Sequence, residues 1–427
     1  MGPFTLADGR SPPYNDDEAG TVFAAVQSIR ILCIERGISK DSGARQGRSN
    51  GRQLMKFSIA RGDLDKAIQR VLAVVSPKTT LPVLANLLLT ADEKANTISL
   101  TATDLDMTVT TSGAAAVEAG GGITLPAKRF AEIVRALGEA DVAVAVDGEE
   151  ISIRSGKSNF RIVGIPTEEF PTLPQSDPAE AFDVDADLLT RMIEKVSFCV
   201  SKDETRPSLN GAYWEFKADS MSMTATDGHR LATFNVEGKF KKQAGKDMIV
   251  PPKALTHAVR IIGAEGGEGV KVAVHENHVA FFIEGTTINS RLLEGPFPNY
   301  HQVIPKDNDK ELLVGREDIT SAVRRVAVLS DTLTHQVKLT LGKKKLDLTV
   351  STPDVGEAKE ELPCKFDSDK MEVGYNANYL LDVLKHLDGD NVRFSLGSAV
   401  GAAVVSSAEP ADGEEHTCLL MPLRLNK

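Results

Sequence analysis

The stretch ISLTATD at residues 98–104 decides the fold, because the chain repeats it twice. It returns as MSMTATD at residues 221–227 and, in altered form, as LDLTVSTPD at residues 346–354. Each copy alternates apolar and polar residues and ends on an aspartate, a pattern typical of a strand that enters a tight turn. The interval of roughly 125 residues predicts three similar units in series.

Two further landmarks recur at about the same interval. Helix starts are expected after Pro126, after Pro251-Pro252 and after Tyr375. Near the end of the units lie Phe170-Pro171, Phe297-Pro298 and Met421-Pro422. These landmarks support the same threefold division.

Each unit also contains two stretches with apolar residues at helical spacing, which predicts helices with one buried face. The six sets are Leu64, Ala67, Ile68, Val71; Phe130, Ile133, Val134, Leu137; Leu189, Met192, Ile193, Val196; Leu255, Ala258, Val259, Ile262; Ile319, Ala322, Val323, Val326; and Leu380, Val383, Leu384, Leu387. Short runs of alternating apolar and polar residues between the helical stretches predict β-hairpins. The predicted fold class is α+β, with three tandem domains of two helices on antiparallel sheet at residues 55–176, 177–306 and 307–427.

Residues 1–54 differ from the rest of the chain. Their second half is a mixture of Gly, Ser, Arg and Gln from Lys40 to Gln53, with little apolar surface to bury. We expect a disordered extension here; the alternative is that translation starts at Met55.

The chain is acidic, with 427 residues, a formal net charge of −11 and a pI near 5.4. A protein that grips nucleic acid over its whole surface is therefore excluded, and any DNA contact needs a local basic surface. Basic residues do gather in the helical stretches, opposite the apolar stripes. They are Lys66, Arg70, Lys128, Arg129, Arg135, Lys195, Lys202, Lys253, Arg260, Arg324 and Arg325. Such a face suits sequence-independent attraction to phosphates, although ordinary solvated helix faces look the same.

The four cysteines, at positions 33, 199, 364 and 418, lie too far apart for a zinc motif, and no long apolar run predicts a membrane span. We expect a cytoplasmic protein without metal or cofactor. Acidic pairs such as Asp104 and Asp106, or Asp388 and Asp390, are explained by turn chemistry rather than metal binding.

Several segments resemble the bacterial DNA polymerase III beta subunit, the DNA sliding clamp. They are Met55-Lys56-Phe57, TLPVLANLLL at residues 80–89, ATDGHRL at residues 225–231, Phe297-Pro298-Asn299-Tyr300, and MPLRL at residues 421–425. The resemblance covers the chain from Met55 to Leu425.

This resemblance implies that each chain is half of a ring, and that two copies join head to tail into a homodimer around duplex DNA. The implied dimer contacts are Arg154, Lys157, Phe160, Val328, Leu329, Glu357, Glu360 and Glu361. The implied DNA-facing residues are Lys78, Lys128, Arg129, Lys202 and Lys253, to which the helix pattern adds Lys66. A closed ring needs only weak phosphate contacts, because topology retains it.

The resemblance also implies a pocket between the second and third domains that binds short linear peptides. Its residues would be Arg206, Leu209, Thr226, Gly228, His229, Arg230, Leu231, Pro298, Val303, Val400, Leu419, Leu420, Met421, Pro422, Leu423 and Arg424. The implied partners are the DNA polymerase III alpha subunit, the clamp-loader delta subunit, translesion polymerases, and mismatch-repair and ligase proteins, at replication forks in the nucleoid. An apolar groove with a few polar groups suits such peptides.

The sequence departs from the common family pattern in places: Gln302 stands where Arg is frequent, Ala402 where Ser is, and Pro207 and Ser208 where aromatic residues occur. Two other readings remain open. Asp227, His229 and Arg230 could form a catalytic group, or the chain could be a peptide-binding scaffold that does not use DNA. The first is disfavoured, because the equivalent turns after Asp104 and Asp354 carry no histidine.

Overall fold

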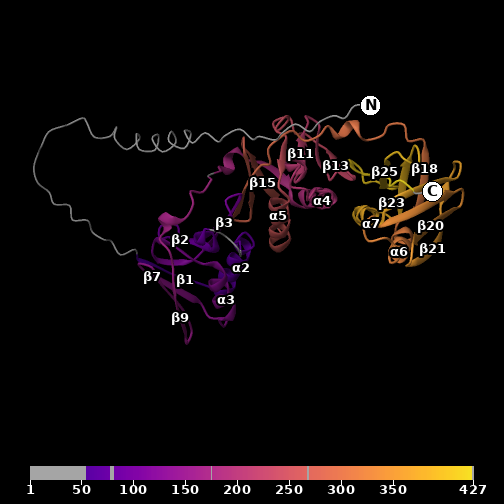
Figure 1. Cartoon of the computed structure of the whole chain (residues 1–427). Helices are drawn as coiled ribbons and strands as arrows, with labels where there is room; N and C mark the ends of the chain where they lie inside the picture. The colour runs from indigo at the N-terminus through magenta and orange to yellow at the C-terminus, as the bar shows by residue number, and fades with distance from the viewer. Residues whose placement is uncertain (1–53, 77–80, 175, 267–268, 426–427) are drawn as a thin grey trace, which may run out of the picture. The chain divides into compact units, whose positions relative to one another are not determined.

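The structure is a computed structural model that describes residues 54–76, 81–174, 176–266 and 269–425 (Figure 1). The expected N-terminal extension falls outside these residues, apart from Leu54, and so does Lys78. Within the described residues the chain forms three tandem domains, each with two helices packed on antiparallel strands. The predicted α+β class is confirmed.

The elements follow one another in nearly the same order in each domain, except that the second has no counterpart of the short strands β5 and β22. The first domain has β1 (Leu54–Ile59), α2 (Arg61–Leu72), β2 (Asn86–Asp92), β3 (Thr97–Thr103), β4 (Met107–Ala114), β5 (Ala116–Ala119), β6 (Gly121–Pro126), α3 (Ala127–Ala136), β7 (Val142–Asp147), β8 (Glu150–Ser155) and β9 (Ser158–Val163). The second has β10 (Phe182–Asp185), α4 (Ala186–Ser197), β11 (Ala212–Phe216), β12 (Ser220–Thr226), β13 (Arg230–Glu237), β14 (Met248–Val250), α5 (Pro252–Glu265), β15 (Gly269–Val274), β16 (His278–Ile283) and β17 (Thr286–Arg291). The third has β18 (Lys310–Gly315), α6 (Arg316–Ala327), β19 (Gln336–Gly342), β20 (Lys345–Thr352), β21 (Gly356–Pro363), β22 (Lys365–Phe366), β23 (Met371–Asn376), α7 (Ala377–His386), β24 (Asn391–Leu396), β25 (Ala403–Ser407) and β26 (Glu414–Leu420).

The apolar stripes of the helices face the core, as the periodicity predicts. All four predicted residues are buried in α2, α4 and α6. In α3 and α5 the stripe is displaced: Ile133 and Val259 are only partly buried, while Ala131 and Ile261 are buried. A small residue such as Ala131 carries too weak an apolar signal to be picked from spacing alone.

Local chemistry explains where the helices begin. Asp185 accepts a hydrogen bond from the backbone N–H of Leu188 and caps α4, and Asn376 accepts two backbone N–H groups and caps α7. Pro252 opens α5, where its fixed φ suits the first turn and its missing N–H costs nothing.

Two of the four sheets run across domain boundaries. Strand β4 pairs with β17 to join the first and second domains in an eight-stranded sheet. Strand β13 pairs with β26 to join the second and third domains in a nine-stranded sheet. The other two sheets lie within single domains, and each has two edge strands: β5 and β9 in the first domain, β21 and β23 in the third.

At each domain junction within the chain, a basic side chain of the second domain donates to backbone carbonyls at the end of a helix in the neighbouring domain. Arg260 of α5 donates to the carbonyl oxygens of Gln69 and Arg70, in the last turn of α2. Lys195 of α4 donates to the carbonyl oxygen of His386, the last residue of α7. These groups satisfy carbonyls that a helix end leaves unpaired and complement its dipole.

None of the helices in the described ranges is long and apolar enough to cross a membrane.

Candidate functional site

The site is built on the turn between β12 and β13, which is the second copy of the repeated motif. The Asp227 carboxylate accepts the backbone N–H groups of His229 and Arg230 through one oxygen, at 2.9 and 3.0 Å. The Thr226 hydroxyl donates to the carbonyl of Arg230 and accepts the N–H of Gly228. Gly228 has a φ of 90°, which glycine adopts without strain. The turn therefore holds the side chains of residues 229 and 230 in fixed directions.

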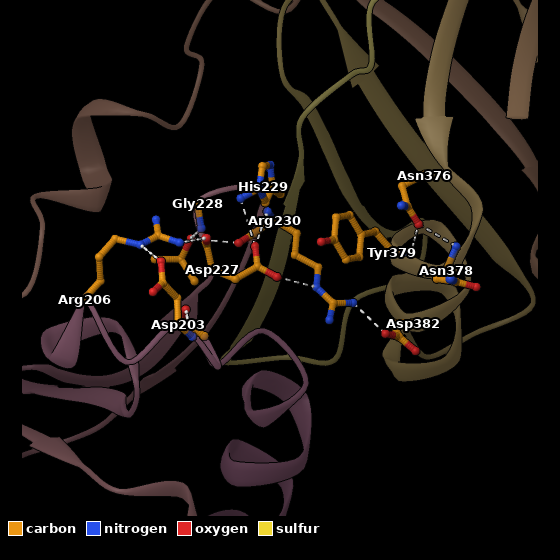
Figure 2. A network of polar contacts seen from close by, with 12 residues as sticks. Asp203, Arg206, Asp227, Gly228, His229, Arg230, Asn376, Asn378, Tyr379 and Asp382 are labelled. Carbon is orange, nitrogen blue, oxygen red and sulfur yellow. Dashed lines mark hydrogen bonds and ion pairs between the residues drawn. The ribbon is translucent and has the colours of Figure 1, made fainter. Parts of the chain in front are cut away.

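A network of charges surrounds this turn, as Figure 2 shows. The Arg230 guanidinium bonds the second oxygen of Asp227 at 3.1 Å, and Asp382 of α7 at 2.6 Å. Arg206 pairs with Asp203 at 2.9 Å and donates to the carbonyl of Asp227. The side chains of this network come from the second and third domains.

Beside the turn lies an apolar groove of about 520 Å³ at the junction of the second and third domains. It is lined by Leu209, Thr226, Gly228, His229, Arg230, Leu231, Pro298, Asn299, Tyr300, Val303, Pro305, Val400, Gly401, Ala402, Leu419 and Met421. Its floor is a small buried cluster of Leu231, Tyr300, Ala402 and Leu419. At its rim Val303, Val400 and Met421 are 55%, 74% and 42% exposed, so apolar surface is available to a ligand.

Most of the residues expected in a pocket meet here, but five do not line it. Leu420 is fully buried in the main core, because successive strand residues point to opposite faces and Leu419 takes the groove side. The backbone N–H of Leu423 instead bonds the carbonyl of Gly374. Pro422, Arg424 and Arg206 also lie outside the lining.

The sequence analysis missed five lining residues: Asn299, Tyr300, Pro305, Gly401 and Ala402. Tyr300 stands in the quoted Phe297–Tyr300 segment, so the signal was present. Its ring is buried, and its hydroxyl lies 3.2 Å from a carboxylate oxygen of Glu215. Residues 401 and 402 have no side-chain chemistry that could have indicated a pocket.

The geometry does not support a catalytic group at Asp227, His229 and Arg230. Both oxygens of Asp227 are occupied by the turn and by Arg230. The His229 ring stacks on Tyr379, with 6.0 Å between ring centroids. Among the described residues, the imidazole of His229 forms no hydrogen bond to a carboxylate or to a nucleophile, so the pairing typical of an activated nucleophile is absent there.

Acidic side chains are used in turns and ion pairs. One oxygen of Asp104 accepts the N–H groups of Asp106 and Met107, and Asp388 pairs with Lys195 at 2.6 Å. Where the structure describes the chain, no group of three or more His, Cys, Asp or Glu residues is arranged to hold a metal ion.

Eight of the eleven basic residues expected on the helix faces fall into two groups; of the other three, Arg135 and Arg324 are exposed and Arg70 donates to the hydroxyl of Thr111. Lys66, Lys128, Arg129 and Lys202 are exposed, as is Lys253, which pairs with Asp104 of the first domain. Three others are tied up within the chain: Arg260 and Lys195 at helix ends, and Arg325 in a bidentate contact with Glu360 at 2.8 and 3.0 Å. Fewer of these basic residues are free to bind DNA than the sequence predicts. The spacing of residues along a helix does not show which groups the end of a long side chain contacts.

Most of the residues expected at a dimer contact lie on or near two edge strands, β9 and β21. Phe160 is half-buried on β9, and Glu357, Glu360 and Glu361 lie on β21. Lys157 is exposed in the turn before β9. Val328, just after α6, is 79% exposed, and Leu329 packs partly against the core. Arg154 lies on β8, which is paired on both sides, so it is not at an edge.

Comparisons with known proteins agree on one family. The N-terminal, central and C-terminal domains of the DNA polymerase III beta subunit match residues 55–174, 183–299 and 301–424. The beta sliding clamp of Caulobacter vibrioides is 35% identical over 379 residues, which are 87% of this chain and 100% of the relative. That of Escherichia coli K12 is 33% identical over 374 residues, with the same coverage.

Solved structures give the same result. A sliding clamp from Bartonella birtlesii, bound to griselimycin, superposes with a TM-score of 0.83 at 34% identity and covers 87% of this chain and 100% of its own. The clamp from Bacillus subtilis has a TM-score of 0.82 at 29% identity, with the same coverage.

Proposed function

The chain belongs to the family of DNA polymerase III beta subunits, the sliding clamps of replication, and from this premise we propose that two copies close head to tail around duplex DNA. The ring tethers polymerases and repair proteins through the groove beside the Asp227 turn. It acts in the cytoplasm, at the nucleoid, as a processivity factor without catalysis of its own.

The observation that carries the dimer is the place of two edge strands, β9 and β21, in the internal repeat. In both junctions within the chain, the outer strand of one domain pairs antiparallel with the last strand of the next domain. Strand β21 is the outer strand of the third domain, and β9 is the last strand of the first. The internal repeat therefore supports a third junction of the same kind, between two copies.

The repeated motif relates the three outer strands to one another. Its central threonine pairs with a residue of the outer strand in every domain. These pairs are Thr101–Thr110, Thr224–Thr233 and Thr349–Lys359. Lys359 is therefore equivalent to Thr110 and Thr233.

The last strands are related through the residue two positions before the N-cap of each domain's first helix. Three successive strand pairings lead from it to the last strand. The paths are Ser58–Ala143–Arg154–Asn159, Asp183–Lys271–Phe282–Thr287 and Leu313–Arg393–Ser406–Thr417. Asn159 is therefore equivalent to Thr287 and Thr417.

These equivalences set the register between the copies. Thr110 lies opposite Thr287, and Thr233 lies opposite Thr417, so Lys359 should lie opposite Asn159 of the second copy. The neighbouring pairs would be Glu361–Lys157, Ala358–Phe160, Glu357–Arg161 and Val355–Val163. Opposite charges and apolar side chains then face each other, and the two valines, 62% and 67% exposed in the single chain, cover one another.

Contacts within one chain bear on three of the expected dimer contacts. Glu360 is already held by Arg325 and Glu361 by Lys345 at 2.6 Å, so each would share its charge between its own chain and the second copy. Val328 is equivalent to Phe198, whose ring stacks at 4.2 Å on His386 of the neighbouring domain. Val328 would therefore pack on α3 of the second copy, which supports its place in the interface.

For DNA, exposed lysines and arginines on the helices, together with Lys202 in the loop after α4, supply the contacts: Lys66, Lys128, Arg129, Lys202 and Lys253. The chain as a whole is acidic, with a net charge of −11. Weak attraction of this kind lets a closed ring slide, because the ring is retained by topology.

The experiment is retention on circular and linear DNA of the same sequence. The loaded protein should stay on a nicked circle in high salt and leave after the circle is cut, since only a closed ring is trapped. Equal retention on both forms would argue for a simple DNA-binding protein, and no retention on either for a scaffold without DNA.

A further inference from the structure

Arg230 lines the groove, yet its charge points away from it. Its side chain is only 11% exposed. The guanidinium reaches across the domain junction to Asp382 of α7, at 2.6 Å, and Figure 2 shows this contact on the side of the turn toward α7. The groove therefore receives the aliphatic stem of Arg230 rather than its cation.

Two aromatic rings hold the guanidinium in this position. Its central carbon lies 4.5 Å from the ring centroid of Tyr379 and 5.5 Å from that of Phe198. Both distances are in the range of cation–π attraction. Burial lowers the pKa of Arg230, but the hydrogen bond to Asp382, together with the charges of Cys199, Asp227 and Asp382, raises it beyond that loss, so the group stays charged.

The platform on α7 is itself rigid. Asn376 accepts the N–H groups of Asn378 and Tyr379 and donates to the carbonyl of Thr334. Tyr379 and Asp382 lie three residues apart and so share one face of the helix.

Asp227 cannot replace Asp382 as the partner of Arg230. One oxygen of Asp227 is committed to the N–H groups of the turn, and its other oxygen bonds Nε of Arg230 only. Without Asp382, which is itself 45% exposed, Nη1 of the largely buried Arg230 side chain would lose its acceptor. An unsatisfied buried charge is costly, so the guanidinium would turn toward the groove, where water is available.

The first junction shows that the Arg–Asp pair is not required to join two domains. Counting along the same strands and helices, Met107 and His257 stand there in place of Arg230 and Asp382. The turn aspartate, Asp104, is paired instead with Lys253. The ion pair is thus a feature of the junction that carries the apolar groove.

We infer that Asp382, which does not line the groove, is a positioning residue that selects its ligands. It keeps the cation of Arg230 on the α7 side, so that the groove accepts apolar side chains and discriminates against acidic ones. This inference rests on the proposed function, because it takes a short peptide as the ligand.

The test compares two fluorescent peptides, one containing Leu and Phe and the other with its Leu replaced by Asp. Asp382→Asn should weaken binding of the apolar peptide about tenfold, which is the usual scale for losing a charged hydrogen bond. It should also shift the ratio of the two dissociation constants in favour of the acidic peptide. Asp382→Glu should restore the ratio.

Asp388→Asn is the matched control. It also removes one negative charge and one ion pair across the same junction, that with Lys195, but it does not touch Arg230. The ratio should remain at the wild-type value. Since both peptides are measured on one sample, partial unfolding of a variant cannot change it.

The outcomes distinguish failure of the role of Asp382 from failure of the proposed peptide site. An equal loss for both peptides, or no change in Asp382→Asn, would overturn the selection role of Asp382. Failure of the wild-type protein to bind the apolar peptide would instead refute the proposed peptide site.

Discussion

At the scale of single residues, His257 shows how the first junction depends on a neutral side chain. It lies on α5 and is 5% exposed, with its ring nitrogen Nδ1 3.3 Å from Arg260. Burial, together with the charges of Arg260 and Lys253, lowers the pKa of His257 to about 4, against a smaller opposing effect of a hydrogen bond with the Arg70 backbone. A protonated ring here would face the same cation that caps α2.

Stability should therefore depend on pH through His257. An unfolded histidine takes up its proton near pH 6.5, whereas the folded one does so only near pH 4, so the unfolded state binds more protons between these values. The free energy of unfolding should fall by about 2 kcal/mol from this residue between pH 7 and pH 5. Urea unfolding at both pH values should show a smaller fall in His257→Gln, but not in His301→Gln, an exposed control. An identical fall in all three proteins would contradict the assignment.

At the scale of elements, β9 and β21 are edge strands whose equivalents in the other domains pair across a domain junction. An unpaired edge exposes backbone groups that favour pairing with another strand. Both edges carry charged side chains on their outer face, Arg161 on β9 and Glu357 on β21. In the proposed register they lie opposite each other.

Reversing these charges should control dimer formation. Arg161→Glu or Glu357→Arg places like charges together, and either should weaken the dimer, whereas the double variant should recover it. Sedimentation should show the mass falling from twice 45.9 kDa toward 45.9 kDa in the single variants. Arg154→Glu is the control, since β8 already has neighbours on both sides. A double variant no better than the singles would argue against this register.

At the scale of the whole molecule, an acidic chain presents a limited number of free cations on its helices. Several basic residues are paired at the domain junctions, so DNA binding depends more strongly on the basic residues that remain free. Lys128 and Arg129 are adjacent, exposed, and at the start of α3.

Lys128→Glu with Arg129→Glu should weaken binding to short linear duplex DNA. The slope of log affinity against log salt should fall by about 2, since each lost phosphate contact contributes close to one unit. Lys343→Glu with Lys344→Glu makes the same change in net charge in the β19–β20 turn, away from the helices, and should have little effect. Equal slopes in wild type and both variants would exclude α3 from the DNA contact.

The sequence by itself determined the parts of this protein that local patterns encode. The repeated ISLTATD motif and the helical spacing were enough for the α+β class, the three tandem domains and the turn that carries Asp227, because apolar periodicity and turn chemistry act within a few residues. The tertiary structure alone decided how these parts are used. Leu419 and Leu420 are neighbours of the same type, yet one forms the floor of the groove and the other the core. Lys195 and Arg260 look like free cations, yet each ends on a carbonyl oxygen of another domain. Such outcomes depend on which distant groups share a space, and the spacing of residues along a chain does not contain that information.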